Sequence, residues 1–347
     1  MGVLCVSRSG LHTGAMMSEE AGFLEALKAN PADDTARLVY ADWLDEHDEP
    51  ERAEFIRVEC EAACTGRESA TYMTLLRRSD RLLRVHASRW FGPLVEAEVA
   101  DHIITSRGFV DCIVLAADSY AAHAEIIAEY APLLRGLHVQ AGGDWRTFFA
   151  ALGTSAIRSL SFDDGVFSTD GATELAACDN TTKLVELNLD HQPLGEDGMA
   201  AVAAAPLWSL ERLSVCECGI GDFGAEELFA GKAFHNLREL DLSENGLTSA
   251  ACSALAMSSG FGRLERLTLC NNRITAEGIS ALAGAPHLDQ LRSLNLYSNP
   301  LGPAGGRAIL ASRHWRKLQE LTLIDCGVGI EAVNDLRWVY GQGAVRA

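Results

Sequence analysis

Long apolar runs are missing from this sequence, so we expect no segment that crosses a bilayer. Basic residues are also scarce: 29 lysines and arginines stand against 48 aspartates and glutamates, which gives a net charge of −19. Sequence-independent binding of nucleic acid depends on clustered basic side chains that neutralise phosphates. The composition therefore argues against a membrane or nucleic-acid partner and favours a protein partner that is neutral or basic.

Motifs of common catalytic sites are missing as well. The chain has no G-x-S-x-G, H-E-x-x-H or C-x-x-C sequence, and the stretch from Gly224 to Lys232 lacks the spacing of a phosphate-binding P-loop. Cys216 and Cys218 are two residues apart, yet no further histidine or cysteine stands at ligand spacing from them. We therefore predict that the protein is not an enzyme and has no cofactor and no metal site.

The ten cysteines show no spacing typical of a disulfide framework, which favours a reduced, cytoplasmic chain. Residues 1–17 contain one arginine, no long apolar segment and no clear cleavage site, so they do not form a secretory signal. We expect residues 1–17 to be a disordered extension. Met16 or Met17 is an alternative start of the protein.

What the sequence does contain is an internal repeat of about 27 residues. Apolar residues recur at positions 1, 4, 6, 11 and 19 of the unit, and glycine or alanine stands at position 15. The units begin at Ile157, Leu184, Leu210, Leu237, Leu264, Leu291 and Leu318. A period this regular indicates stacked units that bury one continuous core.

The repeat matches the pattern L-x-x-L-x-L-x-x-N/C-x-L, as in the unit that starts at Leu237. Position 9 of successive units reads Gln192, Cys218, Asn245, Asn272, Asn299 and Cys326. The pattern resembles leucine-rich repeats, and the unit length is similar to the ribonuclease-inhibitor-like subclass, in which a full helix follows each strand. The resemblance implies an α/β horseshoe with parallel strands on the concave face and helices on the convex face. Side chains at position 9 would then satisfy backbone groups of the turn.

Residues 18–92 are predicted to form a small all-α domain. The first helix should end before Asn30-Pro31, because the residue before a proline disfavours the helical conformation. Asp33-Asp34 favour the start of a second helix. The expected buried stripe of that helix consists of Leu38, Val39, Ala41, Trp43 and Leu44. An N-cap at Asp48 with an early proline starts a third helix, and a fourth is expected over 70–90, before Gly92-Pro93.

This helical region carries a second resemblance. The blocks Tyr-Ala-Asp-Trp-Leu at 40–44 and Glu-Arg-Ala-Glu-Phe-Ile at 51–56 resemble a bacterial repeat-companion domain, which precedes leucine-rich and other repeat arrays. The resemblance covers residues 19–60 and implies a place beside repeats, but no activity. The acidic residues of this region are expected to be surface charge and helix caps. These residues are Asp42, Asp45, Glu51 and Glu54.

A solenoid needs atypical units at its ends, because one face of each end unit has no neighbour. We expect the solenoid to span 93–347, with residues 93–132 as an N-terminal cap that contains a hairpin turn at 106–108. Residues 337–347 are expected to be the C-terminal cap, in which Trp338, Val339 and Tyr340 cover the last repeat.

Strand positions 3, 5, 7 and 8 point away from the core and provide the surface for a partner. We expect an acidic field flanking Arg212 on this concave face, together with residue types that are enriched in binding hot spots. The predicted partner-binding residues are Glu186, Asp190, Arg212, Cys216, Glu239, Asp241, Arg266 and Tyr297. The predicted function is a non-catalytic protein–protein interaction module, and the chain is expected to be a monomer.

Two alternatives remain at this point. Activators of the GTPase Ran share this repeat subclass and an acidic character, so the chain could regulate a small GTPase, although this rests on analogy of fold alone. In the other alternative, the N-terminal helices carry an unknown enzymatic activity that the repeats direct to a target.

Overall fold

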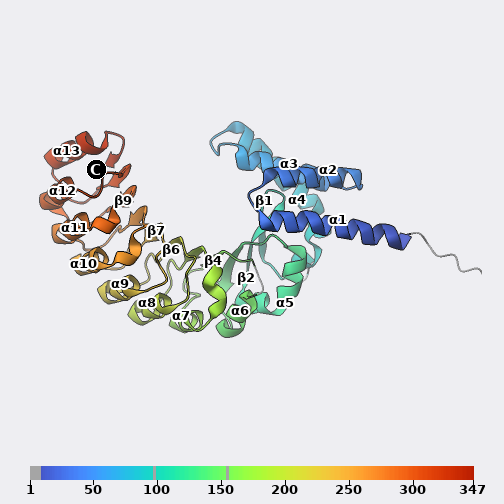
Figure 1. Cartoon of the computed structure of the whole chain (residues 1–347), viewed down its shortest axis with the longest axis horizontal. Helices are drawn as coiled ribbons and strands as arrows, with labels where there is room; N and C mark the ends of the chain where they lie inside the picture. The colour runs from blue at the N-terminus through green and yellow to red at the C-terminus, as the bar shows by residue number, and fades with distance from the viewer. Residues whose placement is uncertain (1–8, 97–98, 154–155) are drawn as a thin grey trace, which may run out of the picture. The chain divides into compact units, whose positions relative to one another are not determined.

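The computed structural model describes residues 9–96, 99–153 and 156–347 (Figure 1). The chain divides into two compact units. Unit 1 consists of Met1–Leu115 and Ala122–Gly136, and unit 2 consists of Ala116–Ala121 and Leu137–Ala347. The division passes through helix α5 (Ala117–Tyr130), whose backbone leaves the helical conformation at His123.

Unit 1 contains the four helices that the sequence predicts, followed by a hairpin. These elements are α1 (Ser9–Ala29), α2 (Asp34–Glu46), α3 (Pro50–Cys64), α4 (Ala70–Glu96), β1 (His102–Ser106) and β2 (Phe109–Ala116). Apolar residues from several of these elements form the larger of two core clusters in the described part of this unit. It contains Leu27, Tyr40, Ala41, Leu44, Ala53, Ile56, Cys60, Phe109 and Leu133.

Two helix ends agree with the sequence prediction. Helix α1 ends at Ala29, directly before Asn30-Pro31. Asp33 caps α2, because its carboxylate accepts hydrogen bonds from the backbone N–H groups of Thr35 at 2.9 Å and Ala36 at 3.2 Å. The start of α1 differs from the expectation: residues 9–17 are helical instead of forming an extension, and residues 1–8 lie outside the described residues. The stretch 9–17 contains no proline that would interrupt the helix.

The expected end of α4 is wrong. This helix runs through Gly92 and Pro93 to Glu96. Phe91 and Leu94 flank the proline and are 2% and 0% exposed, so their burial outweighs the backbone hydrogen bond that the proline cannot donate. The expected cap of α3 is wrong as well, because Asp48 adopts a left-handed conformation with φ 64° and the next residue takes the N-cap position.

The buried stripe of α2 agrees with the prediction at Ala41 and Leu44 but differs at other positions. Leu38 and Val39 are 40% and 50% exposed, while Arg37 and Tyr40 are buried. Arg37 lies over the ring of Phe109, with 5.8 Å between the guanidinium carbon and the ring centroid. Packing of aromatic and guanidinium groups therefore determines which face of α2 is buried, and the aliphatic pattern of the helix does not show this.

The hairpin of unit 1 confirms the predicted turn. Strands β1 and β2 pair antiparallel, and the two turn residues, Arg107 and Gly108, have φ of 52° and 86°. Positive φ at both positions is typical of the tight turns that match the twist of the strands. A Cβ at Gly108 would lie 2.8 Å from the Cα of Ile56, so glycine also lets the turn approach α3. The hairpin groups with the helices of unit 1, not with the repeats as expected.

Unit 2 alternates strands and helices. Its strands are β3 (Gly136–Ala141), β4 (Ser159–Phe162), β5 (Glu186–Asn188), β6 (Arg212–Ser214), β7 (Glu239–Asp241), β8 (Arg266–Thr268), β9 (Ser293–Asn295), β10 (Glu320–Thr322) and β11 (Val345–Arg346). Its helices are α6 (Trp145–Leu152), α7 (Thr169–Ala176), α8 (Gly195–Ala204), α9 (Gly221–Ala230), α10 (Ser249–Met257), α11 (Ala276–Ala283), α12 (Gly302–Leu310) and α13 (Ile330–Tyr340). Short 3-10 helices precede three strands, namely η1 (Asp179–Lys183), η2 (Ser259–Phe261) and η3 (Pro286–Leu288). Among the described helices of both units, none has the length and apolar character needed to cross a membrane.

The strands of unit 2 follow the order of the chain and pair in parallel from β4 to β11. Equivalent residues of successive repeats face each other, as Leu213, Leu240 and Leu267 do. The strands line the inner side of a curved stack and the helices line its outer side (Figure 1). The predicted α/β horseshoe is therefore confirmed for this unit.

The inward positions of the repeat form the core of unit 2. Across the seven units, the residues at positions 1, 4, 6, 11 and 19 are at most 6% exposed, with the exception of the partly buried Val328 in the last unit. At about 25 cal/mol per Å² of apolar surface, this burial is the main stabilising contribution. No unit could bury these residues alone, so the stack is the folding unit.

The polar residues at position 9 are buried, and asparagines among them satisfy backbone groups of the turn, as the sequence predicts, and also bind the neighbouring repeat. The side-chain oxygen of Asn272 accepts hydrogen bonds from the backbone N–H groups of Asn245 at 3.1 Å and Leu247 at 2.9 Å. Its amide nitrogen donates to the carbonyl oxygens of Leu242 and Leu269, both at 3.1 Å. Each such amide therefore satisfies backbone groups of its own turn and of the preceding turn.

Position 15 brings neighbouring helices into close contact. It is occupied by Gly171, Gly198, Gly224, Ala251, Gly278, Gly305 and Ala332. A Cβ at Gly278 on α11 would lie 2.9 Å from the Cα of Ser249 on α10. The absence of a side chain at this position therefore sets the distance between the two helices.

The C-terminal end of unit 2 corrects the predicted cap. Trp338 and Val339 are 87% and 53% exposed and do not cover the last repeat. Instead, Val345 of β11 pairs with Leu321 of β10 and is 3% exposed. An added strand satisfies the backbone of the sheet edge, which aromatic side chains could not do.

We expect Asn272→Ala to lower the free energy of unfolding by about 1–3 kcal/mol, because buried backbone N–H and C=O groups lose their partners. Urea unfolding followed by circular dichroism measures this loss. Asn334→Ala makes the same chemical change on the exposed side of α13 and should change the free energy of unfolding by less than about 0.5 kcal/mol. Equal effects of the two substitutions would contradict the role assigned to position 9.

We expect Gly278→Ala to destabilise the chain by about 1–3 kcal/mol, although alanine is the better helix former, because the added methyl group forces α11 away from α10. Gly284→Ala is the matched control in the same repeat, since its Cβ would approach no atom closer than 3.4 Å. The control should be neutral or slightly stabilising in thermal unfolding. A stabilising Gly278→Ala would show that the helices are not in close contact.

Candidate functional site

A row of alternating charges follows position 3 of the repeat on the inner face of unit 2. The register of the strands places Glu186, Arg212, Glu239 and Arg266 next to one another on β5 to β8. Arg212 Nη2 lies 2.8 Å from a carboxylate oxygen of Glu186, and Arg266 Nη1 lies 3.1 Å from a carboxylate oxygen of Glu239. The hydrogen bond with Glu186 raises the pKa of Arg212. All four side chains are accessible to solvent, so each ion pair is weakened by screening.

This row lines a shallow hollow of about 230 Å³. Position 5 of the same strands contributes the polar residues Asn188, Ser214, Asp241 and Thr268. The hollow therefore presents carboxylate and guanidinium groups in alternation, with uncharged hydrogen-bonding groups beside them. Such a surface can bind polar groups of either charge.

Asp190 and Asp241 bind their own chain. Asp190 Oδ1 accepts hydrogen bonds from the Ser214 hydroxyl at 2.6 Å and from the backbone N–H of Cys216 at 2.8 Å. Asp241 Oδ1 accepts hydrogen bonds from the backbone N–H and the hydroxyl of Ser243, at 2.9 and 2.6 Å. Burial raises the pKa of Asp241. The expected acidic field thus consists of two groups. The glutamates form ion pairs with arginines, and the aspartates form hydrogen bonds that order the ends of the strands.

Cys216 and Cys218, which follow strand β6, have protonated thiols at neutral pH. Burial, with the nearby carboxylates of Asp241 and Asp190, raises the pKa of Cys216 to about 12. Burial also raises the pKa of Cys218 to about 12, and its thiol donates to the carbonyl oxygen of Leu189 at 2.8 Å. Thiols of this kind are poor nucleophiles and poor metal ligands. Within the described ranges, no three histidine, cysteine, aspartate or glutamate side chains gather as a metal site would require.

The backbone at position 8 is a feature that sequence reasoning missed. Six residues at this position have φ between 51° and 59°, in the left-handed region. They are His191, Glu217, Glu244, Asn271, Ser298 and Asp325. The left-handed residue turns the chain at the end of each strand, so that position 9 can point inward. The recurrence of polar residues directly before position 9 was the available signal.

A histidine links the first strands of the same face. His138 Nε2 lies 2.7 Å from Asp163 Oδ1, and His138 Nδ1 lies 2.8 Å from Ser161 Oγ. Serine hydrolases use these three residue types, but they also need hydrogen-bond donors for the oxyanion. Here the backbone N–H of Asp163 donates to the Val139 carbonyl as part of the sheet. We interpret the three side chains as a polar link between β3 and β4.

The structure brings together only some of the predicted partner-binding residues. Those that line the hollow are Glu186, Arg212, Glu239, Asp241 and Arg266. Asp190 and Cys216 lie beside it and are joined by the hydrogen bond described above. Tyr297, one repeat beyond Arg266, is partly buried and does not line the hollow.

The outward positions 3, 5, 7 and 8 were predicted from the sequence, but the pairing of their side chains into rows was not. The row at position 3 continues with Ser293 and Glu320, whose side chains are 3.0 Å apart. A second row lies at position 2, where Arg238 and Arg292 both form ion pairs with Glu265. Arg292 Nε lies 3.5 Å from Glu265 Oε2. The alternation of acidic residues and arginines at one position of successive units was the signal that could have identified both rows.

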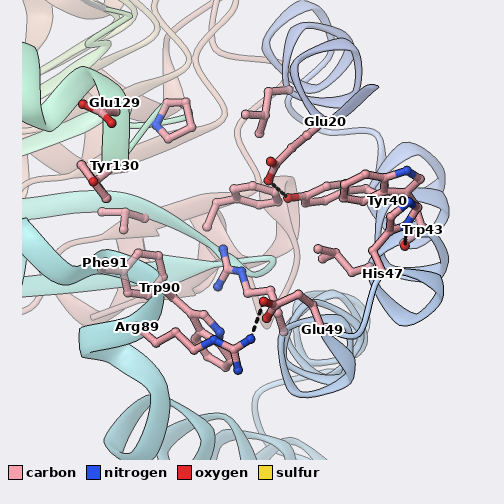
Figure 2. A pocket seen from close by; sticks show the side chains of 16 residues that line it. Glu20, Tyr40, Trp43, His47, Glu49, Arg89, Trp90, Phe91, Glu129 and Tyr130 are labelled. Carbon is pink, nitrogen blue, oxygen red and sulfur yellow. Dashed lines mark hydrogen bonds and ion pairs between the residues drawn. The ribbon is translucent and has the colours of Figure 1, made fainter. Parts of the chain in front are cut away.

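A larger cavity, of about 440 Å³, lies in unit 1 (Figure 2). Its lining comes from α1 to α4, from β2 and from the end of α5. The sequence predicted no site in this region, because its acidic residues were assigned to helix surfaces. Residues from so many separate elements cannot be combined into a site from the sequence alone.

We expect the effect of Asp241→Asn on stability to depend on pH. Burial raises the pKa of Asp241 in the folded state above its unfolded value, so its contribution to stability is fully present below the unfolded pKa and is lost as pH rises through the folded pKa. Asparagine keeps an acceptor oxygen for Ser243 and does not ionise. The free energy of unfolding of the variant, relative to the unmodified chain, should therefore increase between about pH 3 and about pH 7 in urea titrations.

Asp289→Asn is the control for this prediction, because Asp289 is exposed. Its substitution should produce no comparable increase over the same pH range. A relative stability of Asp241→Asn that decreases toward neutral pH would contradict the assignment.

Comparisons with known proteins agree with this geometry. The family model described as Leucine Rich repeat matches residues 235–256 and 290–310. A chain in the crystal structure of the Rad7 and Elc1 complex in yeast is similar to 96% of this chain over 85% of its own length, with 14% identity and a TM-score of 0.50. InlP from Listeria monocytogenes is similar over 61% of this chain and 55% of its own, with 17% identity and a TM-score of 0.39. No curated protein matches the chain. The two matched stretches of unit 2 are therefore leucine-rich repeats, and the neighbouring units share their strand register.

Proposed function

We propose that unit 2 is a non-catalytic protein–protein interaction module that binds its partner on the concave face. The observation that carries this proposal is the accessible row of Glu186, Arg212, Glu239 and Arg266 in the hollow of the sheet. The backbone N–H and C=O groups of these strands form the hydrogen bonds of the sheet, so a partner would contact the side chains. Solenoids use such extended concave surfaces for binding.

The ion pairs of the row can be exchanged for contacts with a partner. Exposed pairs contribute only about 0–1 kcal/mol to stability, so separating Arg212 from Glu186 has little effect on the fold. A partner that supplies a basic group to Glu186 or Glu239 would replace one pair by another. Acidic residues outnumber arginines on this face, and the net charge of the chain is −19, which favours a neutral or basic partner.

Two further observations support this reading. A chain of similar fold occurs in a complex of two proteins, Rad7 and Elc1. Arg266 and Tyr297 belong to residue types that often dominate binding energy. We place the module in the cytoplasm as a monomer, in keeping with the absence of framework spacing among the ten cysteines.

We expect the double substitution Glu186→Lys with Glu239→Lys to weaken partner binding at least about tenfold, because both acidic sites become basic. Asp190 and Asp241 are left unchanged, since they bind the backbone. The partner is first captured from an extract of the source organism with the full chain and then purified. Isothermal titration calorimetry at two salt concentrations measures the affinity, and circular dichroism checks the fold.

Glu226→Lys is the matched control, because Glu226 is exposed on α9 among the outer helices. It should leave the affinity unchanged. A loss of binding with Glu226→Lys but not with the double variant would place the interface on the helices and refute the proposal.

A further inference from the structure

The cavity of unit 1 has walls of aromatic side chains. Tyr40 and Trp43 stand on one side of it, and Phe91 and Tyr130 stand on the other (Figure 2). Its volume of about 440 Å³ lies within the range of small-molecule sites, which is about 300–1,000 Å³. Every residue that lines it belongs to unit 1.

Arg52 lines this cavity and forms no ion pair with any described residue. The guanidinium carbon of Arg52 lies 5.0 Å from the ring centroids of Trp90 and Phe91 and 5.5 Å from that of Phe109. In the described part of the chain, no carboxylate forms an ion pair with Arg52, and its Nη1 is buried without a hydrogen-bond partner. Burial lowers the pKa of Arg52 to about 10, so the side chain still carries its charge at neutral pH. Aromatic faces compensate part of that charge but accept no hydrogen bond from the buried Nη1.

A second unused donor lines the same cavity. The indole nitrogen of Trp90 is buried and has no hydrogen-bond partner among the residues that the structure describes. The other donors nearby are already engaged, because the Tyr40 hydroxyl donates to Glu20 at 2.7 Å and Arg89 binds Glu49 (Figure 2). Buried donors without partners are rare in folded proteins. None of the described acceptors that line the cavity reaches these two donors, and the charge of Arg52 favours a negative acceptor.

We propose that this cavity binds a carboxylate attached to a flat apolar group, with the carboxylate at Arg52 and Trp90 and the apolar group between the aromatic walls. A guanidinium group matches the two oxygens of a carboxylate, and the indole N–H supplies one further hydrogen bond. The rim carries Glu20, Glu49 and Glu129, so a single negative charge is favoured over the double charge of a phosphate. The ligand is either a free aromatic acid or the C-terminal carboxylate of a peptide that ends in an aromatic residue.

The site contains the two sequence blocks that resemble the bacterial repeat-companion domain. Residues 40–44 supply Tyr40 and Trp43 to the cavity, and residues 51–56 supply Arg52. The function proposed for the concave face of the repeats uses no residue of either block. A ligand site in unit 1 gives these side chains a function that is independent of the one proposed for unit 2.

Titration calorimetry of the full chain tests the proposal with phenylacetate and its uncharged analogue phenylacetamide. Phenylacetate should bind, and phenylacetamide should bind at least about tenfold more weakly, because it lacks the charge that Arg52 requires. Arg52→Gln should weaken phenylacetate binding at least about tenfold, and Trp90→Phe, which keeps a ring but removes the N–H donor, should weaken it about fivefold or more. Arg57→Gln is the control on the same helix, since Arg57 pairs with Asp42 and Asp45 and does not line the cavity, and it should leave binding unchanged.

The peptide Ala-Ala-Phe with a free or an amidated C-terminus separates the two sources of the carboxylate. Tighter binding of the free peptide than of phenylacetate identifies a peptide terminus, and the reverse order identifies a small acid. If neither probe binds, or if Arg52→Gln with a native circular dichroism spectrum binds phenylacetate as well as the unmodified chain, the proposal is overturned. Should Arg52→Gln fail to fold, the amide probes and Trp90→Phe still decide the question.

Discussion

The hydrogen bonds of the amide side chains at position 9 are the interaction on which the stacked repeats depend. Asn272 closes the turn of its own repeat and at the same time binds the backbone N–H groups of Asn245 and Leu247 in the repeat before it. These backbone groups are buried, so without the amide they would lie in an apolar interior with no partner. A single repeat could neither hide its leucines nor satisfy its turn. Both requirements are met only when the next repeat is in place, and this makes the stack cooperative.

The same constraint determines what the inner face can do. Since the core takes positions 4 and 6 and the turn takes position 9, only the outward positions of each strand are free to vary. The chain places Glu186, Arg212, Glu239 and Arg266 there, and Asp190 and Asp241 order the strand ends beside them. The recognition proposed for this face would therefore be electrostatic and adjustable, because exposed ion pairs bind each other only weakly.

The sequence determined the repeated part of the fold well and the single elements less well. The period and the inward positions of the repeat could be predicted because the same apolar pattern occurs in seven units, so that each unit supports the interpretation of the others. For elements that occur only once, predictions from the local sequence were wrong. Helix α4 does not end before Pro93, and Trp338 does not cover the last repeat. In both cases a contact distant in sequence decided the outcome. The ion pair between Glu186 and Arg212 could have been predicted by aligning the units. The hydrogen bond from the Cys216 backbone N–H to Asp190 could not, because it depends on the geometry of the turn.

The cavity of unit 1 could not be predicted for a related reason, and its energetics indicate why it is not simply part of the core. Buried charges are usually paired, and exchanging a buried ionic group for an apolar one of similar volume is often neutral or stabilising. At Arg52 the chain instead keeps a guanidinium among aromatic rings, with a buried nitrogen that has no hydrogen-bond partner in the described ranges. Stability alone would favour a leucine or a methionine there. If Arg52 binds a carboxylate ligand, both the donor without an acceptor and the aromatic walls around it are explained. A purely structural role of Arg52 explains only the aromatic walls.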